Sequence, residues 1–316
     1  MKLRSLLHML AYAVAATGTA NGQDYPTKPI RMLTSEPGGG GDIVLRTIGP
    51  DLSSGLGQSI VIDNRPLALS GEIVAKAVPD GYTAIVYGTT LWLGPMLQTM
   101  RYDPLRDFAA VTMMSRSPNV LVVHGSLPVS TVADLITLAK SKPGVLNYSS
   151  GNSGSTSHLA MELFKSMAGI NLVRIPYKGA GPAVNALVAG ETQVMLATAT
   201  SIAGHVKSGR AKALAVTTAQ RSLLIPDLPT VAATGLPGYE SASVYGMVTT
   251  AKTPVAVITR LNREVVKVLA RSEIKDRFLA SGVEAVGSSP EELASLIKSE
   301  MVRMGKVIKD AGIRVD

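Results

Sequence analysis

Two loops carry the residue types best suited to chemistry in this chain. The first, residues 34–42, reads Thr-Ser-Glu-Pro-Gly-Gly-Gly-Gly-Asp and lies between an apolar run and a helical pattern. Glycines let a ligand approach the backbone amides, and the following helix directs its unpaired N–H groups and positive end at the loop. An oxyanion fits such a site without a cationic side chain. We expect Asp42 to cap the helix.

Residues 148–158 form the second loop, Tyr-Ser-Ser-Gly-Asn-Ser-Gly-Ser-Thr-Ser-His. It also joins a predicted strand to a predicted helix, and its hydroxyls and amides add further donors. The two loops together could hold both ends of a dicarboxylate, or one carboxylate between them. His158 is expected to brace the loop or cap the helix rather than to act as a base.

Other chemistries fit these loops less well. The glycines lack the Gly-Lys-Ser/Thr ending of a Walker loop and the spacing of a dinucleotide fingerprint. The chain has no Gly-x-Ser-x-Gly elbow, and its four histidines include His8 in the N-terminal segment, so a serine hydrolase is an improbable alternative.

Short β-branched runs alternate with helical patterns around these loops. This alternation favours an α/β fold whose parallel sheets are covered on both faces. Strands are predicted at 30–34, 59–63, 82–87, 119–123, 145–149, 172–175, 193–196, 211–216 and 242–250, and helices at 42–52, 71–77, 132–140, 155–168, 183–189, 254–270, 272–280 and 289–311.

The helical tail after residue 254 is predicted to return to the first half of the fold. The chain would then cross between two lobes near residues 120–126 and 243–250, and two crossings form a hinge that closes a cleft. We predict a signal peptide at 1–22, a discontinuous lobe I at 23–122 plus 246–316, and lobe II at 123–245.

Composition and the first residues point to export. Lys2 and Arg4 precede a short apolar run and a small-residue patch, the layout of a signal peptide cleaved near residues 20–22. A membrane anchor is the alternative, but that run is shorter than the ~20 residues of a spanning helix. With no cysteine, thiolate metal sites and a lipid anchor are excluded. The net charge of +8 is scattered along the chain, which disfavours nucleic acid.

These features resemble the tripartite tricarboxylate transporter substrate-binding proteins, also called the Bug family, from residue 25 to about residue 313. The resemblance rests on the glycines of residues 38–42 and the loop 148–158, together with the segments 25–30, 63–66, 79–83, 102–104, 176–179 and 228–230. It implies a Venus-flytrap fold of the periplasmic-binding type, two αβ lobes joined by two crossover strands. It also implies amino acid or carboxylate ligands held largely by amides and hydroxyls, without a cofactor or metal.

Several positions depart from the family's pattern. Ser35 stands where the family commonly has an aromatic residue, and near the position of Glu36 the family commonly has a small residue or proline. Glu36 could pair with an ammonium group on the ligand or point to solvent. Ala197 and Thr198 replace a more polar pair, which favours an uncharged or apolar distal group on the ligand.

The sequence therefore predicts a monomeric periplasmic receptor that captures a small carboxylate and presents it to membrane permease subunits, or to a signalling sensor. It is not expected to be an enzyme. The predicted ligand-binding residues are Ser35, Glu36, Gly38, Gly39, Gly40, Asp42, Thr89, Ser150, Asn152, Ser153, Gly154, Ser155, Thr156, His158, Ala197, Thr198 and Tyr245.

Overall fold

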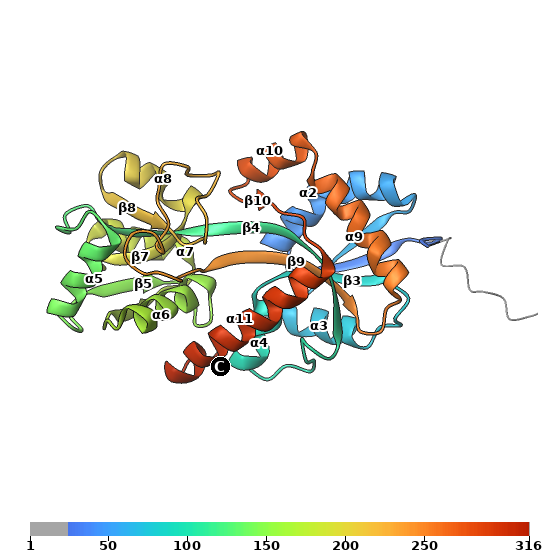
Figure 1. The fold of residues 1–316 in the computed structure, drawn as a ribbon, viewed down its shortest axis with the longest axis horizontal. Coiled ribbons are helices and arrows are strands. Elements are labelled where there is room, and N and C mark those ends of the chain that lie inside the picture. The colour runs from blue at the N-terminus through green and yellow to red at the C-terminus, as the bar shows by residue number, and fades with distance from the viewer. Residues whose placement is uncertain (1–24, 316) are drawn as a thin grey trace, which may run out of the picture.

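The computed structural model describes residues 25–315, so the predicted signal peptide lies outside the described part of the chain. These residues form two lobes laid end to end, with two long strands running between them (Figure 1). The two-lobed α/β fold predicted from the sequence is confirmed.

Lobe I is built on three parallel strands, β1 (Ile30–Thr34), β2 (Ile60–Asn64) and β3 (Thr83–Gly88). Three helices pack on one face: α2 (Gly40–Leu56), α9 (Val255–Leu269) and α10 (Ser272–Ala280). The other face carries α3 (Leu67–Ala75), α4 (Thr90–Leu97) and α11 (Pro290–Asp310).

Lobe II has the same plan. Its parallel strands are β5 (Asn147–Ser150), β6 (Val173–Pro176) and β7 (Val194–Thr198), and β8 (Ala211–Val216) pairs with the connecting strand. Helices α5 (Val132–Ser141) and α6 (Thr156–Ala168) pack on one face, and α7 (Ala180–Ala189) and α8 (Ala199–Lys207) on the other.

The strands β4 (Phe108–His124) and β9 (Ala242–Thr250) connect the lobes. In lobe I, β9 is antiparallel to both β3 and β4, so β3 runs in the direction of β4, toward lobe II. In lobe II, β7 is antiparallel to β4 and runs back toward lobe I. The carboxyl ends of β1 and β3 therefore face those of β5 and β7 across the junction. The predicted lobe boundaries fall within these shared strands and stay a prediction.

One buried apolar cluster crosses the junction on the α4 and α11 side. It includes Trp92 and Met304 of lobe I and Phe164 of lobe II. The ring of Tyr239 meets Phe164 edge-on at 5.8 Å, and the Tyr239 hydroxyl donates to the carbonyl of Ala160 at 2.9 Å. A short edge strand, β10 (Glu284–Ala285), adds a polar link on the opposite side.

Three sequence predictions were wrong in detail. The sheets are mixed rather than purely parallel, because both connecting strands run antiparallel to a neighbour. The first half of β4, before residue 119, was missed; it contains Thr112, Ser115 and Arg116, which interrupt an apolar strand pattern. Helices α4 and α8 were also missed. The apolar α4 contains Pro95 and has no polar face, and α8 is short and rich in small residues.

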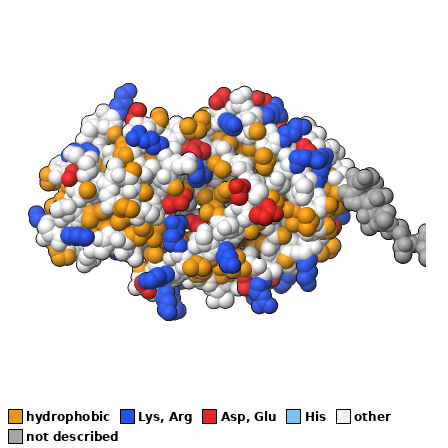
Figure 2. Space-filling model, in the orientation of Figure 1, with side chains coloured by type: hydrophobic (Ala, Val, Ile, Leu, Met, Phe, Trp, Pro, Cys, Tyr) orange, Lys and Arg blue, Asp and Glu red, His pale blue; other side chains and the backbone are white. Residues whose placement is uncertain are grey.

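Lysine and arginine side chains are spread over both lobes on the face shown in Figure 2, rather than gathered in one stripe. Across residues 25–315 no helix combines the length and apolar character needed to span a bilayer.

Candidate functional site

Helices from both lobes begin where the two lobes face each other. Helices α2 and α4 follow the carboxyl ends of β1 and β3, and α6 and α8 follow those of β5 and β7. The first turn of a helix has unpaired N–H groups and a partial positive charge. The junction therefore gathers positive helix ends from both lobes, which suits an anion.

The glycine loop leaves three helix amides free. The amide of Gly38 donates to Asp42 Oδ2 and that of Gly39 to the carbonyl of Glu36, both at 2.9 Å. The first helical bond runs from Ile43 to the carbonyl of Gly39. Within residues 25–315 no acceptor is found for the amides of the next three residues, 40–42. They are the donors that an oxyanion would use.

Asp42 does not cap the helix, contrary to the sequence prediction. Gly39 is the N-cap, and Asp42 is the third helical residue. Its buried carboxylate accepts from Gly38, from Arg46 Nε at 2.9 Å and from Asn64 Nδ2 at 2.8 Å. Burial opposes ionisation, but these hydrogen bonds hold the pKa of Asp42 below its usual value. The carboxylate therefore braces the loop from behind.

Ser35, Glu36 and Tyr245 lie close to the free amides. Ser35 is buried, and its Oγ has no hydrogen-bond partner among the described residues. The phenol of Tyr245 lies against the backbone of Gly40. Burial, with a smaller effect of the Glu36 charge, raises the pKa of Tyr245, so its phenol is a neutral donor at neutral pH. Glu36 itself is exposed.

The second loop is held by its own side chains. Ser155 is the N-cap of α6 and accepts from the amide of His158 at 3.4 Å. His158 is buried, and its Nδ1 accepts from the amide of Gly154 at 3.2 Å. Burial and then the charge of Arg174 lower the pKa of His158 to about 4, so the ring is neutral at pH 7. His158 is a brace in the structure.

Arg174 was missed by the sequence analysis. It lies on β6, the strand beside β5, and its guanidinium reaches under the second loop. Nε donates to Ser150 Oγ at 2.8 Å, Nη1 to Ser153 Oγ at 3.1 Å and Nη2 to the carbonyl of Gly151 at 3.0 Å. The signal available in the sequence was a basic residue inside a short apolar strand.

The two lobes meet at Thr89 and Thr156, which line one narrow cavity. Glu300 of α11 lines the same cavity and accepts from Trp92 Nε1 at 3.3 Å and from Arg303 at 2.9 Å. Burial raises the pKa of Glu300. The structure thus brings together Thr89 and Thr156, two predicted residues that lie far apart in the sequence.

Ala197 and Thr198, at the end of β7, were both predicted to contact the ligand, but the structure places them differently. The side chain of Ala197 packs into the core between β4 and α8, so it presents no surface to a ligand. Thr198 is exposed, and its Oγ1 is bonded to Ser201. Opposite Thr198 in the ladder lies Asn119, which is buried and whose Nδ2 has no partner among the described residues.

The remaining predicted residues lie on the second loop. Asn152 and Ser153 are exposed, and among residues 25–315 no acceptor is found for their amides or for those of Thr156 and Ser157. Gly154 has a φ of +75° and abuts Leu97 of α4 and Val315 of the C-terminal segment. This contact joins the second loop to lobe I.

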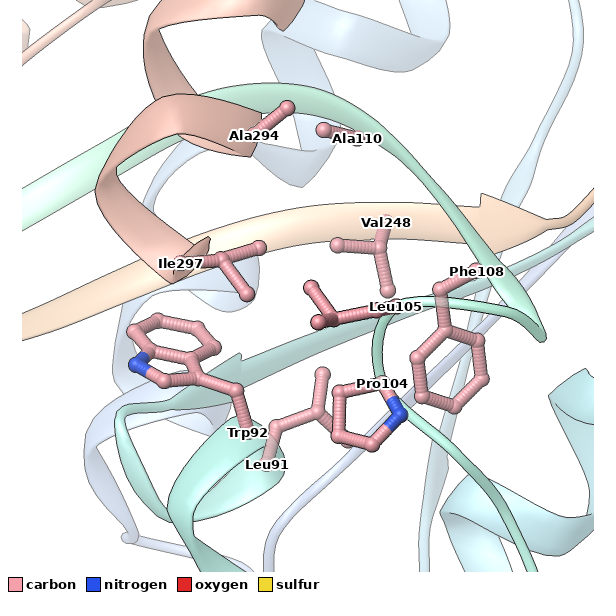
Figure 3. Close-up of a pocket in the computed structure, with 9 residues that line it drawn as sticks. All are labelled: Leu91, Trp92, Pro104, Leu105, Phe108, Ala110, Val248, Ala294 and Ile297. Carbon is pink, nitrogen blue, oxygen red and sulfur yellow. The ribbon is translucent and has the colours of Figure 1, made fainter. Parts of the chain in front are cut away.

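The other cavities differ in character. One beside the second loop is lined by Lys165, Arg174 and Arg314 together with Ser153, His158 and Glu162. One of about 80 Å3 inside lobe I is lined by apolar side chains from α4, β4, β9 and α11, such as Trp92, Phe108 and Ile297 (Figure 3). Within residues 25–315, no three His, Asp or Glu residues are grouped closely enough to hold a metal ion.

Comparison with known proteins agrees with this geometry. Residues 44–313 match the sequence model of the tripartite tricarboxylate transporter family receptor. The chain belongs to this receptor family. The family consists of solute-binding proteins rather than enzymes, so the loops described above belong to a receptor, and the predicted family is confirmed.

Relatives of this receptor span nearly its whole length. A UPF0065 protein encoded in the tcbD–tcbE intergenic region of Pseudomonas sp. strain P51 is 34% identical over 95% of this chain and 91% of its own. Rpa4515 of R. palustris, solved with adipate, is 37% identical, with a TM-score of 0.72 over 92% of this chain and 99% of its own. MatC from Rhodopseudomonas palustris, solved with malate, is 26% identical, with a TM-score of 0.69 over 90% of this chain and 99% of its own.

Proposed function

We propose that this receptor binds a small carboxylate between its two lobes in the periplasm. The observation that carries the proposal is the set of free amides at the starts of α2 and α6, on facing edges of the two lobes. Backbone N–H groups at helix ends bind oxyanions well. The carboxylates bound by Rpa4515 and MatC support the same ligand class.

Thermal unfolding of the purified protein tests the proposal. A ligand that binds only the folded state raises the free energy of unfolding by about 2.7 kcal/mol at 100 times its Kd. We expect a rise in Tm with at least one member of a panel of mono- and dicarboxylates and amino acids. The matched primary amides, which lack the negative charge, should give none. Equal shifts with acids and amides would reject anion recognition.

We also propose that the closed, monomeric receptor delivers its ligand to membrane permease subunits. A signalling sensor is the second candidate, since the same closing cleft serves both. Uptake of the labelled carboxylate by cells that carry the receptor, with and without the permease, separates the two. Uptake that needs the receptor supports delivery to a permease, whereas receptor-dependent transcription without uptake supports a sensor.

A further inference from the structure

A polar cavity lies between the C-terminal segment of lobe I and the second loop of lobe II. Its volume is about 440 Å3, and it is lined by residues of α6, β6 and the second loop together with residues 311–314. None of the described residues that line it belongs to the glycine loop 34–42. The cavity is therefore separate from the amides at the start of α2.

The lining of this cavity is positively charged. Its cationic side chains are Lys165 of α6, Arg174 of β6 and Arg314 of the C-terminal segment. Among the described lining residues one carboxylate, that of Glu162, opposes them, and the ring of His158 is neutral at pH 7. Three cations and one anion give a net charge of +2. The C-terminal end of α11 contributes roughly −0.5 elementary charge, which leaves the cavity positive.

The carboxylate of Glu162 is already occupied. Its Oε1 accepts from the hydroxyl of Tyr148 at 2.5 Å and from Lys165 Nζ at 2.8 Å, and its Oε2 accepts from the same Nζ at 3.0 Å. Lys165 thus balances Glu162. Arg174 and Arg314 take part in none of the ion pairs found among residues 25–315. Their two charges have no carboxylate partner there.

Hydrogen-bond donors remain available in the same cavity. The three hydrogen bonds of Arg174 all go to neutral acceptors, namely Ser150 Oγ, Ser153 Oγ and the carbonyl of Gly151. A guanidinium has five N–H groups, so two of them find no acceptor within the described residues. Because Arg174 uses the acceptor side of the Ser153 hydroxyl, that O–H group can also donate. The exposed guanidinium of Arg314 adds further donors.

The two unpaired guanidinium groups come from different lobes. Val315, next to Arg314, donates its amide to the carbonyl of Leu97 at 3.1 Å, which holds the C-terminal segment on α4 of lobe I. Gly154 of the second loop lies against both Val315 and Leu97. Contact between the lobes thus brings the positive charges of Arg174 and Arg314 to one cavity, where they repel each other unless an anion lies between them.

We propose that this cavity binds a doubly charged oxyanion between Arg174 and Arg314, either an inorganic ion such as sulfate or phosphate or the phosphate group of a small ester. A dianion matches the net charge of the lining. A tetrahedral oxyanion presents acceptors in several directions, which suits guanidinium donors that arrive from separate elements. The site is additional to the proposed carboxylate site, and an ion held there links lobe I to lobe II.

Calorimetry at pH 8 and constant ionic strength tests the site with sodium sulfate, sodium phosphate and glycerol 3-phosphate. We expect one saturable site per chain for at least one of them, with nitrate, a singly charged oxyanion, bound about tenfold or more weakly. Arg314→Gln should weaken binding by about tenfold or more. Arg314→Lys should weaken it less, since lysine keeps the charge and loses the planar fork. Tighter binding of glycerol 3-phosphate than of phosphate assigns the site to an ester, and the reverse assigns it to a free ion.

The control is Arg106→Gln, which removes the same charge from an exposed arginine outside this cavity and should leave the affinity unchanged. A crystal grown with selenate locates the ion, and its selenium peak should lie between Arg174 and Arg314. The inference is overturned by the absence of saturable binding, by equal binding of nitrate and sulfate, by equal losses in Arg314→Gln and Arg106→Gln, or by a selenium peak only at the start of α2. Each of these results leaves the proposed carboxylate receptor standing.

Discussion

The phenol of Tyr245, on the connecting strand β9, lies directly against the backbone of Gly40, the first residue of α2. A Cβ on Gly40 would lie 2.8 Å from Cε2 of that ring and nearer still to its hydroxyl. The strand that links the lobes thus supports the glycine loop of residues 34–42.

Gly40→Ala should therefore weaken ligand binding, because either the loop or the Tyr245 ring must move. We expect a loss of about tenfold or more in affinity, the effect of misplacing one or two charge-assisted hydrogen bonds of about 1.5–3 kcal/mol each. The matched control is Gly49→Ala on the same helix, where a Cβ meets no atom within 4 Å. That control should bind normally; equal losses in both variants would contradict the role of the Tyr245 contact.

Asp42→Asn should destabilise the first loop and the protein. The variant loses a charge that accepts from Gly38, Arg46 and Asn64, at a cost of about 1–3 kcal/mol in urea unfolding at pH 7. Because the pKa of Asp42 is lowered on folding, its contribution is present above the unfolded value of 3.8 and is lost as pH falls below it. Wild type and variant should converge in strong acid; a gap that persists there would argue against this origin.

His158 should make the folded state sensitive to mild acid. Its pKa falls from 6.5 in the unfolded chain to about 4 on folding, so the unfolded chain binds more protons between these values. Stability should decline as pH falls from 6.5 to 4. His158→Asn keeps an acceptor for the Gly154 amide and removes the titration, so its unfolding free energy should change less over this window. Parallel profiles for both proteins would exclude His158 as the source.

Glu284 links the lobes on the side away from the shared apolar cluster. On β10 of lobe I, it accepts from Ser222 Oγ at 2.5 Å and from the amide of Leu223 at 2.9 Å in lobe II, and pairs with Arg116 at 3.5 Å. Glu284→Ala should speed hydrogen exchange of the Leu223 amide and lower stability by about 1–3 kcal/mol. Ser222→Ala should give a smaller effect of the same kind. Unchanged exchange in Glu284→Ala would show that this link is not closed in solution.

The sequence was most informative where backbone chemistry dominates. Runs of glycine and serine predicted two loops that each join a strand to a helix, and the structure has both, because those residue types change what the backbone can do. Strands such as 30–34 and 211–216 were placed correctly, since their apolar runs are sharply bounded.

Side-chain roles depended on neighbours that the sequence does not place. Arg174 braces the second loop because β6 lies beside β5, and Ala197 is buried because it packs with residues of β4, α7 and α8. Asp42 turns to Arg46 and Asn64 rather than capping the helix, since Gly39 occupies the cap. These relationships arise from strand order and helix packing, which a periodic pattern does not encode.

The donors at the starts of α2 and α6 are main-chain atoms, so any substitution other than to proline leaves them in place. On the proposed function, changes at Glu36, Thr198 or Asn119 would alter which molecule is preferred, while the main-chain donors would still bind its acid group. A receptor of this kind could acquire new ligands by single side-chain substitutions while its main-chain donors stay the same. No intermediate variant would then have to lose binding.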